Sequence, residues 1–91
     1  MERAFEGIVF GDVQGVGFRY FALEQARDLG VQGWVRNLPD GTVGFHGEGP
    51  SESVEEWIRH LKQGPVSGRV DRLTGDWLPS AEGHLRFEIK G

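Results

Sequence analysis

The sequence predicts a single α+β domain with the element order β-α-β-β-α-β, in which two helices cover one face of an antiparallel four-stranded sheet. Two segments have apolar residues at helical spacing, other segments alternate apolar and polar residues as strands do, and turns rich in glycine and proline separate them. The chain has 91 residues, of which 37% are hydrophobic, enough for one core. We therefore expect one domain spanning residues 1–91.

The first strand and the first helix are predicted in the first third of the chain. Residues 3–10 have apolar side chains at both odd and even positions, which is typical of a central strand with both faces covered. Residues 18–29 follow with apolar residues at helical spacing, and Gly30 provides a C-terminal stop. The apolar positions of this helix are Phe18, Phe21, Ala22, Ala26 and Leu29.

A hairpin and a second helix are predicted in the middle of the chain. Residues 31–36 and 42–48 are short strand-like runs on either side of Pro39-Asp40-Gly41, a turn signal. The second helix has Ser51 and Ser53 as candidate N-caps and ends at Gly64-Pro65. Its apolar stripe consists of Val54, Trp57, Ile58 and Leu61.

The last third of the chain contains two strand-like segments, which differ in how regularly apolar and polar residues alternate. Residues 66–78 alternate poorly and contain Gly75, which favours an edge strand or an extended arm. Residues 85–90 alternate cleanly, which is typical of a half-buried strand. The element order is that of the ferredoxin-like split β-α-β sandwich, with spatial strand order 4-1-3-2. In that topology the loop after the first strand and Asn37 lie at the same edge of the sheet.

Composition excludes several classes of function. The net charge of −4 disfavours nucleic acid and anionic membranes as partners. The absence of cysteine excludes thiolate metal sites and cysteine nucleophiles. No apolar run has the length of a signal or membrane span, so a cytoplasmic protein is expected. His46, His60 and His84 are scattered without metal-ligand spacing, so no metal or cofactor is expected.

The segment from Gly11 to Arg19 has the composition of a phosphate-binding loop. Three glycines in seven residues allow several backbone N–H groups to point into one hollow at the start of a helix. Arg19 adds a guanidinium where the helix dipole alone disfavours a cation. The structural alternative is a tight strand-to-helix turn. Gln14 either contacts the ligand or braces the loop, and a brace is favoured.

Asn37 comes directly before the turn at Pro39-Asp40-Gly41. On its own it is interpreted as a turn residue, but its expected position at the same sheet edge as Arg19 favours a functional role. An amide has no useful proton affinity, so Asn37 could orient a water molecule by hydrogen bonding but could not act as a base.

The motifs of the chain resemble the acylphosphatase family. Residues 9–19 resemble its first signature, and Gly33-Trp34-Val35-Arg36-Asn37, with residues 41–43 and 47–49, resembles the second. The resemblance implies a monomeric, metal-free and cofactor-free hydrolase of small acyl phosphates, which would bind inorganic phosphate or sulfate as a product-like ligand. It implies that Arg19 and backbone amides hold the phosphate, and that Asn37 positions the attacking water. The amides are those of Gly15, Val16, Gly17 and Phe18.

The chemistry of an acyl phosphate suits this set of residues. Its leaving group is a carboxylate of low pKa, so a general acid is hardly needed. What remains is charge on the phosphoryl oxygens, which fixed N–H dipoles and a guanidinium stabilise.

Two other functions remain open on the sequence. One is a non-catalytic or carbamoyl-phosphate-handling acylphosphatase-like module, as in larger hydrogenase-maturation proteins, which would have the same motifs. The other is an RNA-binding ferredoxin-like domain with Phe45 and Phe87 exposed for base stacking, which the acidic charge disfavours.

Overall fold

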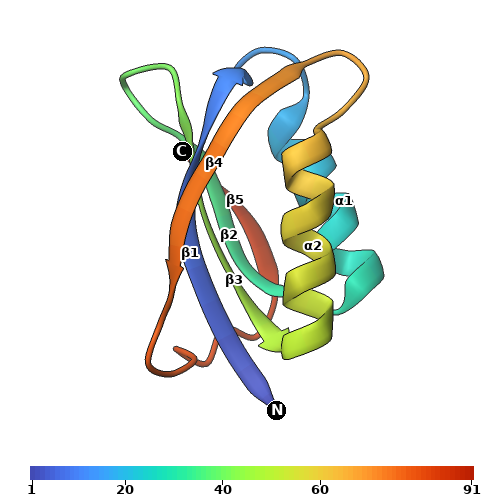
Figure 1. Ribbon diagram of the computed structural model, residues 1–91, viewed down its shortest axis with the longest axis vertical. Helices are drawn as coiled ribbons and strands as arrows, with labels where there is room; N and C mark the ends of the chain where they lie inside the picture. Colours follow the sequence, from blue (N-terminus) through green and yellow to red (C-terminus); the bar gives the residue numbers. More distant parts are fainter.

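The computed structural model describes residues 1–91 and shows two helices packed on one face of a five-stranded sheet (Figure 1). The order of strands across the sheet is β4-β1-β3-β2-β5. The strands are β1 (Glu2–Asp12), β2 (Gln32–Asn37), β3 (Val43–Pro50), β4 (Arg69–Trp77) and β5 (Phe87–Lys90), and the helices are α1 (Phe18–Leu29) and α2 (Ser51–Gln63).

The predicted ferredoxin-like arrangement is confirmed for the first four strands. They follow the order 4-1-3-2, and every pair among them is antiparallel. The prediction of a four-stranded, wholly antiparallel sheet was wrong, because β5 adds a fifth strand that pairs in parallel with β2. Alternation along residues 85–90 indicated a strand but carried no information about its partner. Leu85 lies outside β5 and is 96% exposed.

Helix α1 has the bounds that the sequence predicted. It begins after Gly17 and ends before Gly30, and both glycines are left-handed, with φ of 80° and 76°. The N–H of Gly30 donates to the carbonyl oxygens of Ala26 and Arg27, which closes the helix in the manner of a glycine C-terminal stop.

Helix α2 ends at Gln63 before Gly64, as predicted, but its start differs from the prediction. Pro50 occupies the N-cap position, so neither Ser51 nor Ser53 caps the helix. Ser51 instead donates to the carbonyl oxygen of Met1 through its backbone N–H at 2.9 Å and its hydroxyl at 3.1 Å. This pairing fastens the start of α2 to the start of β1.

The core lies between the helices and the sheet. Trp57 is fully buried and its indole N–H donates to the carbonyl oxygen of Ala22 at 3.1 Å, which joins α2 to α1. Phe45 and Phe87 pack edge-on against Trp57, with ring centroids 5.5 and 5.4 Å apart. Burial of each large apolar side chain stabilises the fold by about 2 kcal/mol. Because Phe45 and Phe87 are core residues, they cannot serve as a platform for stacking bases. Neither helix has the length and apolar character needed to cross a bilayer.

Candidate active site

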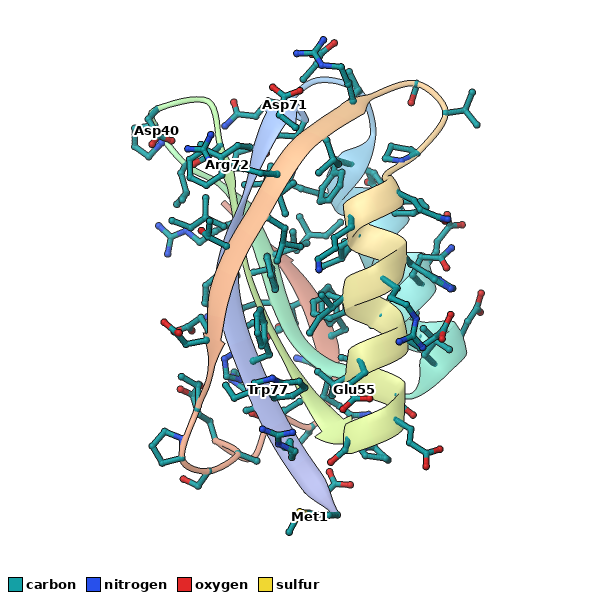
Figure 2. All side chains as sticks on the ribbon, viewed as in Figure 1. Met1, Asp40, Glu55, Asp71, Arg72 and Trp77 are labelled. Carbon is teal, nitrogen blue, oxygen red and sulfur yellow. The ribbon has the colours of Figure 1, made fainter.

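Two connections lie at one end of the sheet, where β1 and β2 both end, as the topology predicted. The loop between β1 and α1 and the turn between β2 and β3 both lie at the upper end of the molecule in Figure 1. Figure 2 shows Asp40 at the tip of the turn, at the same end as Asp71 on the strand next to β1. Asn37 is the last residue of β2, so it lies at the base of this turn.

Gln14 joins the two connections. Its side-chain amide donates to the carbonyl oxygens of Leu38 and Thr42, each at 2.8 Å. Both carbonyls belong to the turn that follows Asn37, so the side chain of Gln14 fixes the position of the loop relative to Asn37. Gln14 is therefore a brace, which is the interpretation that the sequence favoured.

The turn itself is held by Asp40. A carboxylate oxygen of Asp40 accepts the backbone N–H of Thr42 at 3.0 Å and its hydroxyl at 2.5 Å. These hydrogen bonds, led by the one from the hydroxyl, lower the pKa of the exposed Asp40 carboxyl below its usual value. A further bond of 3.1 Å runs from the N–H of Gly41 to the carbonyl oxygen of Leu38. The base of the turn is thus rigidly connected to β3.

The loop before α1 depends on the backbone conformation of two glycines. Gly15 and Gly17 have φ of 74° and 80°, in the left-handed region that other residues rarely adopt. An added Cβ at either position would meet no atom within 4 Å. The requirement for glycine is therefore conformational rather than steric.

This conformation leaves a run of backbone donors free. The N–H groups of residues 15–20 donate to no acceptor in the protein, and the first helical hydrogen bond of α1 runs from Phe21 to Gly17 at 3.0 Å. Gly17 provides no side-chain cap, and the first turn of α1 contains no acidic residue. Free N–H groups at the positive end of a helix dipole form an anion site.

Two neighbours hold the loop in place. The hydroxyl of Ser67, in the connection between α2 and β4, donates to the carbonyl oxygen of Val16 at 2.6 Å. Phe18 is only 1% exposed and its ring packs against Phe21, so its side chain is not available to a ligand. The contact of Ser67 was missed by the sequence analysis, because no local pattern links residues that are 51 positions apart.

Arg19 and Asn37 are the two polar side chains predicted to act at this edge. Arg19 lies half-buried in the first turn of α1 and forms no ion pair with an acidic side chain. Strand alternation places Asn37 on the same, helix-covered face as Val35. The Oδ1 atom of Asn37 is buried and has no hydrogen-bond donor in the protein. A buried acceptor without a partner is a position for a bound water or ligand.

The expectation that the histidines are scattered is wrong for two of them. His46 and His84 lie with their ring centroids 4.9 Å apart and form a cluster with Glu48 and Glu82, whereas His60 lies on α2 beside Glu56 and outside this cluster. The local signal was a His-x-Glu pair on a strand and a Glu-x-His pair in a later loop. Only the tertiary structure brings the two pairs together.

Comparison with known proteins agrees with the fold and the motifs. The model of the family described as Acylphosphatase matches residues 5–89. An acylphosphatase of Thermococcus kodakarensis is 49% identical over 83 residues, which cover 91% of this chain and 90% of the relative. The crystal structure of acylphosphatase from Bacillus subtilis superposes with a TM-score of 0.94 at 37% identity, with 100% of each chain covered.

A larger protein contains a similar unit. The crystal structure of full-length HypF, in its phosphate- and nucleotide-bound form, matches all of this chain with a TM-score of 0.91 at 28% identity. The match covers only 12% of HypF, in contrast to the complete coverage of the Bacillus subtilis protein. The family model matches residues 5–89, and the alignment with the Thermococcus kodakarensis relative covers nearly all of both chains. This chain belongs to the acylphosphatase family.

Proposed function

We propose that this protein hydrolyses the carboxyl–phosphate bond of acyl phosphates, giving a carboxylate and inorganic phosphate, and that the loop of residues 14–19, which includes Arg19, forms the active site together with Asn37. The observation that carries the site is the run of free backbone N–H groups from residue 15 to residue 20. The family match over residues 5–89 supports the activity.

The loop binds the phosphate group of the substrate. The N–H groups of Gly15, Val16, Gly17 and Phe18 donate to its oxygens, and the guanidinium of Arg19 adds a charged pair of donors. In phosphoryl transfer the transition state carries charge on the equatorial oxygens, so donors fixed in advance stabilise it most. The loop glycines and the braces from Gln14 and Ser67 hold these donors in place before the substrate arrives.

Asn37 aims the water molecule. Its free Oδ1 accepts a hydrogen from water and turns a lone pair of the water oxygen towards phosphorus. A new P–O bond forms while the bond between phosphorus and the acyl oxygen breaks, and the electron pair leaves with the carboxylate. The water proton passes to a phosphate oxygen, since the amide of Asn37 cannot accept it.

Hydrolysis of benzoyl phosphate in excess chelator tests this assignment. We expect Arg19→Ala to lower kcat/KM by about 10²-fold or more, as loss of a transition-state donor does. Asn37→Ala should lower kcat while inhibition by inorganic phosphate stays unchanged, because the phosphate donors remain. Arg27→Ala, exposed in the last turn of α1, and Gln32→Ala, at the far end of β2, are matched controls. Wild-type rates in both Arg19→Ala and Asn37→Ala would contradict the assignment.

The same loop would bind inorganic phosphate or sulfate as product-like ligands, and protection of the protein against thermal unfolding by phosphate measures this. We also propose that the protein acts as a monomer on a small-molecule substrate. Light scattering on a sizing column tests the oligomeric state. The cytoplasmic location stays a prediction from the sequence.

A further inference from the structure

A cluster of polar side chains lies on the face of the sheet that the helices leave uncovered. His46 and Glu48 occupy alternate positions of β3, opposite in orientation to the core residue Phe45. The connection between β4 and β5 brings Glu82 and His84 over them. His46 is 0% exposed and Glu48 is 3% exposed, so these two side chains are core-like in burial although both are polar.

The four side chains present their ligand atoms to one point. One nitrogen or oxygen from each lies within 4.8 Å of the other three. Nε2 of His46 lies 2.7 Å from Oε2 of Glu48 and 3.7 Å from Oε1 of Glu82, and Nε2 of His84 lies 3.0 Å from the same Glu82 oxygen. Ligands bound at about 2.1 Å to one ion lie about 3.0–3.4 Å apart at octahedral or tetrahedral angles. Small side-chain shifts would therefore close the four atoms around an ion.

Hydrogen bonds already orient the two buried side chains, Glu48 and His46. The Glu48 carboxylate accepts the backbone N–H groups of Glu82, Gly83 and His84 at 2.9, 2.7 and 2.8 Å. Oε2 of Glu48 also forms a hydrogen bond of 2.7 Å with Nε2 of His46, and an ion bound between these two atoms would take the place of that hydrogen bond. On the other side of the ring, Nδ1 of His46 lies 3.2 Å from a carboxylate oxygen of Glu6. A carboxylate behind a histidine is the usual outer partner of a metal-bound imidazole.

The charges around the cluster favour a cation. Three carboxylates, those of Glu6, Glu48 and Glu82, face His46, and no lysine or arginine forms an ion pair with any of them. The two imidazoles are the only basic groups paired with these carboxylates. A divalent ion would balance this excess of negative charge.

We propose that His46, Glu48, Glu82 and His84 bind a first-row divalent transition-metal ion, such as Zn²⁺, with Glu6 as the outer partner of His46. Two imidazoles and two carboxylates suit this class of ion rather than Ca²⁺ or Mg²⁺, which prefer oxygen ligands alone. The connection between β4 and β5 lies at the end of the sheet opposite the loop before α1 (Figure 1). The ion is therefore structural: it fastens this connection to β3.

Titration of the chelator-stripped protein with Zn²⁺ by calorimetry tests the proposal, with the visible absorption of bound Co²⁺ as a second readout. We expect one ion per chain and a higher Tm with the ion than without it. Glu82→Gln and His84→Gln should each weaken binding by about tenfold or more. The Glu82 side chain is 52% exposed, and the hydrogen bond from Glu82 to Glu48 comes from the backbone N–H. Glu82→Gln should therefore keep the fold. Circular dichroism of the metal-free variants checks this.

His60→Gln is the matched control. His60 also lies next to a glutamate, with Nε2 at 2.9 Å from Glu56, but on α2 and outside the cluster. Its substitution should leave the affinity for Zn²⁺ at the wild-type value. The proposal is overturned if the wild-type protein binds no ion at micromolar Zn²⁺. It is equally overturned if Glu82→Gln and His84→Gln bind as the wild type does, or if His60→Gln alone abolishes binding.

Discussion

The side-chain amide of Gln14 donates a hydrogen bond of 2.8 Å to the carbonyl oxygen of Leu38, the residue that follows Asn37. A second bond of the same length runs from this amide to Thr42. These two bonds fix the distance between the loop, which has free N–H groups, and Asn37, which has a free side-chain carbonyl oxygen.

Substitution of Gln14 should therefore affect catalysis without removing a group that contacts substrate. We expect Gln14→Glu, which keeps the shape but cannot donate when ionised, to lower kcat by about 10²-fold, because misplacement by about 1 Å is that costly. The free energy of unfolding should fall by about 1–2 kcal/mol as two carbonyls lose a donor. Benzoyl phosphate kinetics and urea unfolding measure the two effects. Gln63→Glu, at the exposed end of α2, is the control. Unchanged kcat in Gln14→Glu would show that the brace is dispensable.

The conformation of Gly17 should matter for phosphate binding. Gly17 and Gly30 flank α1 with nearly equal φ, and an added Cβ meets no atom at either. Valine at either position costs about 1–2 kcal/mol of stability, because an L residue is strained there. We expect Gly17→Val also to weaken inhibition by inorganic phosphate, which Gly30→Val leaves intact. Gly17→Asn should be milder, since asparagine tolerates this region. Equal phosphate affinities in all three variants would contradict the role of the loop.

Glu48 should make the stability of the metal-free protein depend on pH. Burial acts to raise the pKa of Glu48, but the hydrogen bond from His46 and three backbone N–H groups outweigh it and lower the pKa from 4.5 to about 2. A carboxyl with a lowered pKa stabilises the fold above its unfolded pKa, and this contribution is lost as the pH falls from about 5 to about 2. The shift corresponds to roughly 3 kcal/mol.

Urea unfolding between pH 7 and pH 2, in the presence of a chelator, tests this dependence. The charged or titratable side chains that face Glu48 are His46, Glu82 and His84, and Glu6 faces His46 from β1. We expect Glu48→Gln to be less stable than wild type at pH 7 and the two to converge near pH 2. Glu55→Gln, exposed on α2, should follow the wild-type curve. A constant difference between Glu48→Gln and wild type at all pH values would refute the linkage.

Gly47 leaves room for the ring of Trp57, from α2, against β3. A Cβ at Gly47 would lie 2.3 Å from Cζ3 and 2.7 Å from Cε3 of the buried Trp57. We expect Gly47→Ala to lower the free energy of unfolding by about 3 kcal/mol, because overpacking forces Trp57 out of its position. Gly44→Ala on the same strand meets only the flexible end of Leu38, at 3.3 Å, and should cost much less. Thermal unfolding of both variants gives the comparison, and equal Tm values would contradict it.

The sequence by itself determined the features that depend on short-range pattern. The bounds of α1, the hairpin of β2 and β3, and the end of α2 follow from spacing, glycine stops and turn residues, all of which act over a few positions. The loop before α1 and Asn37 were assigned to one edge of the sheet, because the order of elements leaves few topologies. The start of α2 was mistaken because Ser51 has a more distant partner, Met1.

Only the tertiary structure decided which distant groups meet. The parallel pairing of β5 with β2, the bonds from Gln14 to Leu38 and Thr42, and the free Oδ1 of Asn37 depend on how the chain returns to the sheet. The cluster of His46 and Glu48 with Glu82 and His84 joins residues more than thirty positions apart in the sequence. A sequence shows residue types and local periods, whereas a hydrogen-bond partner or a metal ligand is defined by distance in space.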